Sequence, residues 1–243
     1  MYSRRVIVNE VYLNEQSASI RHLCAHDRRL AKVISMIGPI QYQLHTDCYS
    51  FFVNHIIGQM LSNKVRDVLY GRLLELCSGN ITAETIAALP DEQIRSIGLS
   101  NAKVHYIREF TDALESGQIT PALYPQMSDQ EIIRSLTAIR GIGVWTAKMY
   151  LIFALDRPDV LPYEDGAFLQ SYKWLYKTDD ATPSAVRKKC RKWHPYASVA
   201  ARYMYRALDM GITKQEFHLF KQNTCDPSAD EKSLDKFLYI NTI

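Results

Sequence analysis

The chain has 243 residues, of which 47% are hydrophobic, and its formal net charge is only +3. This length and apolar content suit one or two compact domains with a substantial core. The small net charge excludes a strongly basic or strongly acidic chain, and it is compatible with nucleic-acid binding without indicating it.

The cysteines and the apolar runs narrow the class further. The five cysteines are odd in number and scattered, and none forms a Cys-x-x-Cys pair, which argues against a disulfide framework or a zinc site. Residues 1–6 lack the apolar run of a signal peptide, and the longest useful apolar run, 149–155, is far shorter than the ~20 residues of a membrane span. We therefore expect a soluble intracellular protein that is not secreted. It would be cytoplasmic and nucleoid-associated in a bacterium, or nuclear in a eukaryote.

Helical signals dominate the chain. Period-two patterning is limited to short extended segments at 5–12 and 40–44. Apolar residues recur at helical spacing over 53–60 and 65–76, and Ser62 stands where the second of these helices would be capped. Cap signals predict the starts of further helices at Thr82, Asp91, Ser100, Thr182 and Thr213.

A tight turn between two helices is predicted around residue 141. Ser128 and Glu131 form a Ser-x-x-Glu capping box, so a helix should start there and carry its apolar stripe to Ile139. Gly141 can end that helix in a left-handed conformation, and Gly143 leaves room for another backbone to approach closely.

The helix after this turn is the second half of the pattern. Residues 146–155 are apolar nearly all round, which predicts a buried helix. Its first turn would present the N–H groups of 144–147, and such a helix end attracts a phosphate. A Gly-x-Gly sequence alone is equally compatible with an ordinary interhelical turn.

A lone acid follows this second helix. Asp165 lies 22 residues after Gly143, an offset that a helix of roughly a dozen residues and a returning loop would span. The carboxylate and the phosphate-binding turn would then face one cleft. A helix cap or an ion-pair partner is the other interpretation of Asp165, and the neighbouring Glu164 is the second candidate for a functional acid.

A dense basic cluster precedes Trp193. Its members are Arg187, Lys188, Lys189, Arg191 and Lys192. Such a cluster is commonly a solvated helix face, whereas beside a DNA-binding cleft it favours contact with phosphates.

Five short segments follow one another in an order that is typical of one enzyme family. They are IIGQMLS at 56–62, LSNAK at 99–103, IRGIGVWTA at 139–147, LPYED at 161–165 and WHPYAS at 193–198. Together they resemble the helix-hairpin-helix DNA glycosylase superfamily, and most of all its bacterial 3-methyladenine DNA glycosylase II branch. The resemblance covers about residues 27–220, and Arg140 replaces the proline that is usual in the hairpin.

The resemblance implies an all-α, two-lobed fold with the active-site cleft between the lobes. One helical lobe would span 46–145 and end in the hairpin. The other would combine an N-terminal segment, 1–45, with residues 146–243, which carry the catalytic aspartate.

The same resemblance implies a monofunctional DNA glycosylase of base excision repair. Such an enzyme flips an alkylated purine, such as 3-methyladenine or 7-methylguanine, out of double-stranded DNA and hydrolyses its N-glycosidic bond, which leaves an abasic site. The alternatives are the same fold acting on uracil, hypoxanthine or an oxidised base, a catalytically silent DNA-binding protein that keeps the hairpin, and a helical protein-binding scaffold.

Catalytic and base-pocket residues are also implied. Asp165 would stabilise positive charge on the sugar and orient or deprotonate the attacking water. Trp145 stands where strand-cutting members carry a Schiff-base lysine, and Lys148 is almost one helical turn further on, so no lyase activity is expected. Trp145 and Tyr196 would stack on the flipped base, with Met149 beside them, where the branch can have a tyrosine. Core packing is the alternative role of both aromatics.

The implied DNA contacts lie near the hairpin and in three other segments. Met60 would be the wedge that fills the gap left by the flipped base, unless it is a core methionine. The other contacts would be made by Gln59, Ser62, Lys103, Arg140, Gly141, Gly143, Val144, Thr146 and Ser198. No metal or cofactor is expected in the chemistry, although hairpin carbonyls could hold a sodium or potassium ion. We expect a monomer that binds DNA and no membrane.

Overall fold

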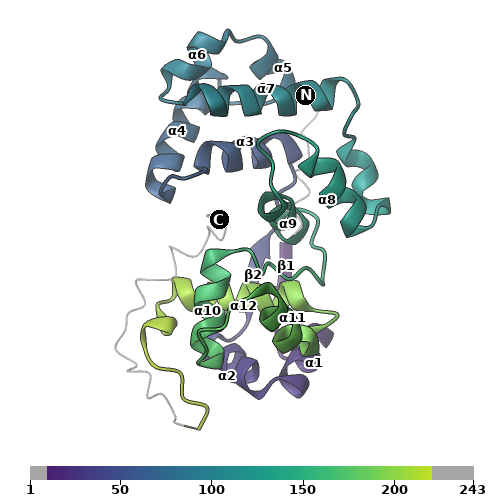
Figure 1. Cartoon of the computed structure of the whole chain (residues 1–243), viewed down its shortest axis with the longest axis vertical. Coiled ribbons are helices and arrows are strands. Elements are labelled where there is room, and N and C mark those ends of the chain that lie inside the picture. The colour runs from purple at the N-terminus through teal and green to yellow at the C-terminus, as the bar shows by residue number, and fades with distance from the viewer. Residues whose placement is uncertain (1–9, 221–243) are drawn as a thin grey trace, which may run out of the picture. The chain divides into compact units, whose positions relative to one another are not determined.

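The computed structural model describes residues 10–220, and in this range it contains twelve α-helices and one pair of short strands. This content confirms the all-α fold class (Figure 1). The described residues form two compact units. The continuous unit is His45–Leu155, and the discontinuous unit combines residues 10–44 with 156–220. None of the described helices is both long enough and apolar enough to cross a lipid bilayer.

The discontinuous unit is built from two separate stretches of chain around α12. Helix α12 packs against α10, α2 and α1, and nearly all of its residues are buried, so it forms the core of the unit. The elements are β1 (Glu10–Leu13), α1 (Ala18–His26), α2 (Arg28–Ile37), β2 (Ile40–Gln43), α10 (Gly166–Tyr176), α11 (Pro183–Cys190) and α12 (Ala197–Asp209), with 3₁₀ turns η2 (Arg191–Trp193) and η3 (Ile212–Lys214).

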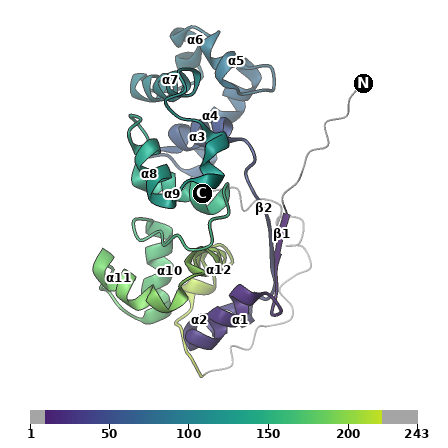
Figure 2. The ribbon, with the colours of Figure 1, turned by 90° about the vertical axis from the view of Figure 1, so that its right-hand side faces the viewer.

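The two strands of this unit are antiparallel. Glu10 lies opposite Gln43 and Leu13 opposite Ile40, and the strands run side by side in Figure 2. Ile40 and Tyr42 are buried whereas the glutamine between them is exposed, which is the alternation of a half-buried strand. The extended segments predicted at 5–12 and 40–44 are therefore confirmed from Glu10 onward, and residues 5–9 lie outside the described range.

The continuous unit is helical throughout. Side-chain oxygens of Ser62, Thr82 and Ser100 cap α4, α5 and α7, as the cap signals predict. Helix α3 packs against α4, α7 and α9, and α8 packs against α9. The elements are α3 (Cys48–Gly58), α4 (Asn63–Leu76), α5 (Ala83–Ala87), α6 (Asp91–Ser96), α7 (Asn101–Glu115), η1 (Pro121–Gln126), α8 (Asp129–Thr137) and α9 (Val144–Phe153).

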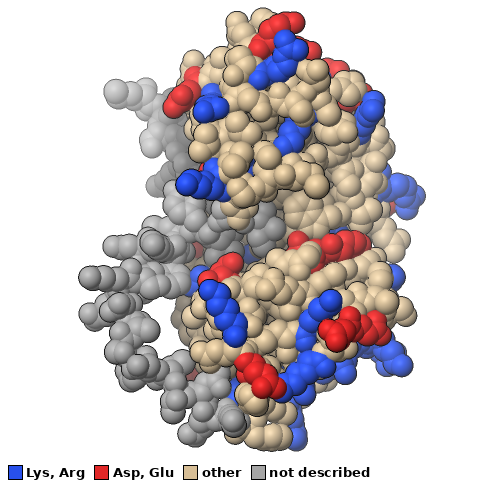
Figure 3. All heavy atoms as spheres, turned by 60° about the vertical axis from the view of Figure 1, so that its left-hand side comes forward, with Lys and Arg blue, Asp and Glu red and all other residues tan. Residues whose placement is uncertain are grey.

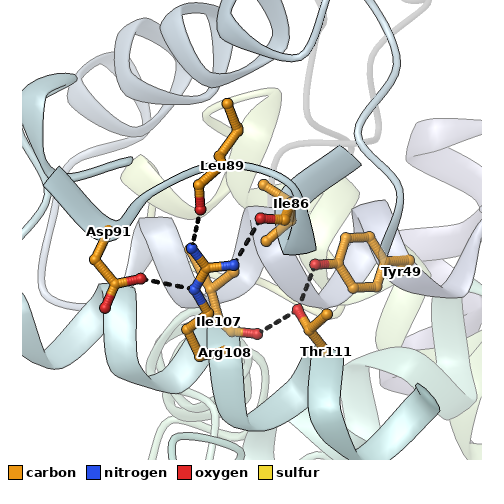
Figure 4. Close-up of polar contacts among 7 residues, drawn as sticks. All are labelled: Tyr49, Ile86, Leu89, Asp91, Ile107, Arg108 and Thr111. Carbon is orange, nitrogen blue, oxygen red and sulfur yellow. Dashed lines mark hydrogen bonds and ion pairs between the residues drawn. The ribbon is translucent and has the colours of Figure 1, made fainter. Parts of the chain in front are cut away.

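One arginine joins two short helices of this unit to the long helix α7. Arg108 on α7 donates from Nε to Asp91 at 2.7 Å and from its terminal nitrogens to the carbonyl oxygens of Ile86, at 2.6 Å, and of Leu89 (Figure 4). Because each of these acceptors lies at a different place on α5, α6 or their connection, the guanidinium fixes both helices on α7.

Two expectations about chain organisation differ from the structure. The lobe predicted to end at residue 145 continues to Leu155, because α9 packs against α8 and α3 of the same unit. The helix predicted to start at Thr213 is wrong within the described residues, where only the short turn η3 forms and Gln215 is already extended. Phe217 packs edge-on against Trp174 at 5.1 Å, so this stretch follows the surface of α10 instead of coiling.

Candidate functional site

The predicted turn between α8 and α9 forms as the sequence indicates. Ser128 and Glu131 make a complete capping box at the start of α8, in which the Glu131 carboxylate accepts from the Ser128 amide at 2.8 Å. Gly141 has φ +91°, the left-handed conformation that ends this helical segment. Gly143 then caps α9 with its backbone alone, since it has no side chain to cover the helix end. The helix-hairpin-helix is therefore confirmed as local structure.

The two glycines of the turn are required for different reasons. A Cβ added to Gly141 would lie 2.4 Å from Cγ of Tyr106, so this residue is needed both for its positive φ and for close packing on α7. A Cβ added to Gly143 would meet nothing within 4 Å, and Gly143 is exposed. The open space at Gly143 is therefore on the surface, where another backbone can approach.

The residues around the turn divide into surface and interior. Arg140 and Val144 are exposed, whereas the predicted DNA contact Thr146 is buried, so its side chain does not lie on the surface. The amide of Ala147 donates to the Gly143 carbonyl oxygen at 3.0 Å. The set of N–H groups predicted to face a phosphate therefore ends before Ala147, because that amide already belongs to the helical ladder.

The Gly58–Ser62 stretch lies beside the hairpin in the continuous unit. Gln59 Nε2 donates to the Gly141 carbonyl oxygen at 2.7 Å. Met60 has φ +58° and a fully exposed side chain, so the alternative that it is a core methionine is wrong. Ser62 caps α4, with its hydroxyl accepting from the Val65 amide at 3.4 Å. This segment is thus a strained loop that displays two apolar side chains, of which Met60 is the more exposed and Leu61 the less.

Lys103 supports the same segment from α7. Its Nζ donates to the Ile57 carbonyl oxygen at 2.7 Å, at the carboxyl end of α3, and burial lowers the pKa of the Lys103 amine. Lys103 and Gln59 were both predicted to contact DNA. In the structure their polar groups bind backbone carbonyls of the continuous unit, so both position the loop that carries Met60.

The predicted pocket residues of α9 lie at different depths. Trp145 is half-buried, and its ring lies 5.9 Å from the ring of His55, which is itself stacked on Phe51. Met149 is fully buried, so a base could reach it only if neighbouring side chains moved. Lys148 is also buried. Of the predicted pocket residues of α9, Trp145 therefore keeps part of its side chain accessible, at the start of the helix.

Asp165 is a buried acid of the discontinuous unit. It stands at the amino end of α10, where Oδ1 accepts from the Phe168 amide at 2.6 Å, and only 5% of the residue is exposed. The positive end of a helix stabilises a carboxylate. Glu164, the neighbouring candidate, is exposed. Asp165 is therefore a helix cap, which was one of the two interpretations of this residue. The cap holds the carboxylate in place and is compatible with a chemical role.

A buried phenol lies against this carboxylate. The pKa of Tyr205 on α12 is raised well above its ordinary value, first by burial and then by the charge of Asp165 and a hydrogen bond with it. Tyr205 therefore stays protonated at neutral pH as a neighbour of Asp165. Sequence reasoning missed this residue, because nothing in its local pattern distinguishes it from the other apolar-face positions of α12.

One carboxylate, that of Asp27, holds the segment around Trp193 in place. Trp193 is fully buried, and its Nε1 donates to Oδ2 of Asp27 at 2.9 Å. The same Asp27 oxygen accepts from the Tyr176 hydroxyl and pairs with Lys192 Nζ at 3.1 Å. Asp27 also caps α2, through the amides of Arg29 and Leu30. Sequence patterns did not single out Asp27, because its partners Tyr176 and Trp193 lie 149 and 166 residues away.

Tyr196 and Ser198 follow this anchor. Tyr196 is half-buried, its amide donates to the Trp193 carbonyl oxygen at 2.7 Å, and its ring meets the His22 ring edge-on at 5.3 Å. Ser198 was predicted to contact DNA. It is buried, and its hydroxyl accepts from the Val160 amide at 2.8 Å, so it binds the backbone that leads into the Asp165 segment.

Metal binding has little support from the described side chains. Within residues 10–220, no group of three or more His, Cys, Asp or Glu residues could hold a metal ion. Of the hairpin carbonyls proposed for an alkali ion, that of Ile139 accepts from the Ile142 amide at 3.1 Å and that of Gly141 accepts from Gln59. Each of these oxygens keeps a second lone pair, so the alkali-ion site at the hairpin stays a prediction.

The sequence and the fold are similar to those of known DNA repair proteins. Residues 53–195 match the family described as HhH-GPD superfamily base excision DNA repair protein. The chain is 28% identical to DNA-3-methyladenine glycosylase 1 of Schizosaccharomyces pombe over 183 residues, which are 74% of this chain and 80% of that protein.

Two solved structures share the fold. The DNA-3-methyladenine glycosidase of Bacillus halodurans has a TM-score of 0.74 and 32% identity, covering 85% of this chain and 96% of the other. The Schizosaccharomyces pombe 3-methyladenine DNA glycosylase in complex with abasic DNA has a TM-score of 0.73 and 24% identity, covering 85% of this chain and all of the other. Because the family match takes in more than half of the chain, including the hairpin and Asp165, this protein belongs to the HhH-GPD superfamily of base excision DNA repair proteins.

Proposed function

We propose that the protein is a monofunctional DNA glycosylase that hydrolyses the N-glycosidic bond of alkylated purines in duplex DNA and leaves an abasic site. The observation that carries the proposal is Asp165, a buried carboxylate held at the amino end of α10, the next α-helix in the chain after that of the hairpin. The names of the similar proteins, which are 3-methyladenine glycosylases and glycosidases, support the class of substrate.

The proposed chemistry follows from charge. Breaking the bond between sugar C1′ and the base nitrogen puts positive charge on the sugar, and a fixed carboxylate stabilises that charge more strongly in a site of low polarity than in water. Asp165 is buried and its Oδ1 is oriented by the Phe168 amide, whereas Glu164 is exposed to solvent. We therefore assign to Asp165 the stabilisation of the sugar cation and the orientation or deprotonation of the attacking water.

The attacking nucleophile in this proposal is water. Strand-cutting members of the superfamily carry a Schiff-base lysine at the second residue after the hairpin glycine, and in this chain that residue is Trp145. Lys148 is buried one turn further on. Sodium borohydride should therefore trap no covalent complex between the protein and DNA that contains a damaged base. A trapped adduct, mapped to Lys148 or to another lysine, would show that the enzyme also has lyase activity.

The proposed DNA contacts are of two kinds, to the phosphate backbone and to the base stack. The exposed turn at Arg140, Gly143 and Val144 offers backbone amides and a cation to the phosphates. Met60, fully exposed on its strained loop, would enter the base stack when the damaged nucleotide is flipped out.

Two aromatic side chains would receive the flipped base. Trp145 and Tyr196 are both half-buried, so each keeps part of a ring surface accessible. An N-alkylated purine is cationic, and cation–π attraction to such rings contributes about 0.5–2 kcal/mol. A cationic base is also an activated leaving group, so no general acid is needed, and we assign none.

Release of 3-methyladenine and 7-methylguanine from methylated duplex DNA tests the proposal. Wild type should release both bases and Asp165→Asn should release neither, because asparagine retains an oxygen that can cap α10 but carries no charge. Glu164→Gln is the matched control and should keep its activity. Equal release by wild type and Asp165→Asn would move the catalytic role to Glu164. No release by wild type would redirect the test to duplexes with uracil, hypoxanthine or an oxidised base.

A further inference from the structure

The carboxyl end of α11 carries a concentration of positive charge that the proposed chemistry does not use. Five of the six residues at 187–192 are lysine or arginine. Of these, Lys192 pairs with Asp27, whereas the other four make no ion pair with a carboxylate of residues 10–220. Those four are all exposed, and we call them the α11 basic surface: Arg187, Lys188, Lys189 and Arg191.

The charge of the chain as a whole does not reveal this group. The net charge of the chain is only +3, and on the face drawn in Figure 3 basic side chains lie among acidic ones. Like charges one helical turn apart, such as Arg187 and Arg191, repel one another, and an anion that approaches them relieves this repulsion.

The α11 basic surface adjoins the segment that carries Asp165. The Arg187 guanidinium carbon lies 4.5 Å from the centre of the Tyr163 ring, and Tyr163 is two residues before Asp165 in the same unit. Arg187 Nε also donates to the Pro183 carbonyl oxygen at 3.2 Å. These two contacts orient the guanidinium, and the terminal nitrogens keep the planar fork that suits a phosphate.

Stabilisation of the helix is the competing explanation of these charges. Cations in the last turn of a helix contribute about 0.3–1 kcal/mol each through the helix dipole. Lys189 Nζ also lies 5.2 Å from the centre of the Tyr176 ring, a contact within the fold. Neither effect accounts for the position of Arg187 against Tyr163, on the side of α11 that adjoins the Asp165 segment.

We propose that the α11 basic surface binds backbone phosphates of the DNA strand next to the damaged nucleotide. The discontinuous unit then has a phosphate-binding site of its own, in addition to the hairpin of the continuous unit. The inference rests on the proposed glycosylase function for its location beside Asp165. Contacts of this kind supply affinity and register and carry no preference for base sequence.

The salt dependence of DNA binding tests this inference. The quadruple variant R187Q/K188Q/K189Q/R191Q removes the surface, and R21Q/R28Q/K173Q/K214Q removes four exposed cations of the same unit from α1, α2, α10 and η3. Fluorescence anisotropy would give the affinity of each protein for a duplex with a tetrahydrofuran abasic analogue between about 50 and 200 mM KCl. In the first variant, the slope of log affinity against log salt should fall in magnitude by about 0.9 for each phosphate that is no longer neutralised. The control should keep the slope of wild type. Equal slopes in the two variants would overturn the inference.

Two further measurements separate the possible failures. Thermal unfolding distinguishes helix stabilisation from binding, because a lower melting temperature with an unchanged slope would mean that the cations serve only the fold. Should the quadruple variant fail to fold, Arg187→Gln alone should reduce the slope by about 0.9, while R187K/R191K should keep the slope of wild type. If wild type releases a base and the quadruple variant keeps the wild-type slope, the α11 site is refuted and the proposed glycosylase function stands. Altered slopes without base release on any lesion would refute the glycosylase function and leave the DNA-binding surface.

Discussion

Gln59 Nε2 donates to the carbonyl oxygen of Gly141 at 2.7 Å, across 82 residues of sequence. This bond joins the loop that displays Met60 to the turn of the hairpin, within one compact unit. Gln59, which the sequence predicts to contact DNA, therefore connects the Met60 loop to the hairpin turn, and these are the two elements proposed to contact DNA.

Replacing Gln59 tests this connection. Gln59→Ala should loosen the loop and increase amide hydrogen exchange over residues 58–62, because one side chain-to-backbone hydrogen bond contributes about 1 kcal/mol. If DNA binding loses the same free energy of about 1 kcal/mol, the affinity for an abasic duplex should fall about fivefold. Gln93→Ala, at an exposed position of α6, is the control. Unchanged exchange at 58–62 would show that the loop holds its shape without this bond.

Replacement by alanine should affect stability at Gly141 and DNA binding at Gly143. Gly141→Ala should lower the free energy of unfolding by about 2–4 kcal/mol, because it combines a positive φ with a clash against Tyr106. Gly143→Ala should change it by less than about 1 kcal/mol, since the added methyl meets nothing. That methyl should nevertheless weaken DNA binding, because it occupies the space a DNA backbone would approach. Urea denaturation and anisotropy together would separate the two effects.

Met60 should matter only where a base stack must be filled. Met60→Ala should slow excision from duplex DNA and leave excision from single-stranded DNA nearly unchanged, because only the duplex has a gap to occupy. Met210→Ala removes a methionine that is 45% exposed on the discontinuous unit and should change neither rate. Single-turnover rates on the two substrates provide the measurement. If Met60→Ala changes both rates by the same factor, Met60 does not act as a wedge.

Asp27 should make stability depend on acid pH. Burial would raise the pKa of its carboxyl, but hydrogen bonds from Tyr176 and Trp193 and the ammonium of Lys192 outweigh burial and lower that pKa below the ordinary 3.8. A carboxyl whose pKa is lower in the folded state stabilises the protein fully above its unfolded pKa, and this stabilisation is lost as the pH falls through the folded value.

The variant Asp27→Asn gives the measurement. It should lower the free energy of unfolding by about 2 kcal/mol at pH 7. The difference from wild type should shrink as the pH falls from about 5 to 2. Asp179→Asn, an exposed position in the same unit, should follow the wild-type curve. A pH-independent difference would mean that the charge of Asp27 does not contribute.

Local signals in the sequence predicted local structure well. The capping box of Ser128, the left-handed Gly141 and the buried α9 all depend on residues within a few positions of one another, and all three form. The signal at Thr213 failed because a capping box needs an apolar periodic stretch behind it, and Phe217 packs against α10 instead.

Local sequence patterns did not predict the contacts between residues that lie far apart in the chain. Ser198 and Gln59 carry polar groups that could as well face DNA as the protein, and their actual partners are 38 and 82 residues away. The pairing of Tyr205 with Asp165 likewise depends on how α12 packs against α10. The sequence therefore identified the segments of the site, whereas the three-dimensional packing decides which side chains remain available on their surfaces.

The division of the chain into a continuous and a discontinuous unit has a consequence for its synthesis on the ribosome. The continuous unit emerges as one uninterrupted stretch, so its internal contacts can form as soon as α9 has left the exit tunnel. Asp27 must instead wait for Tyr176 and Trp193, which follow it by 149 and 166 residues. Closing such long loops is slow. The unit that carries Asp165 therefore matures last, and a nascent chain holds its hairpin before the proposed catalytic carboxylate is in place.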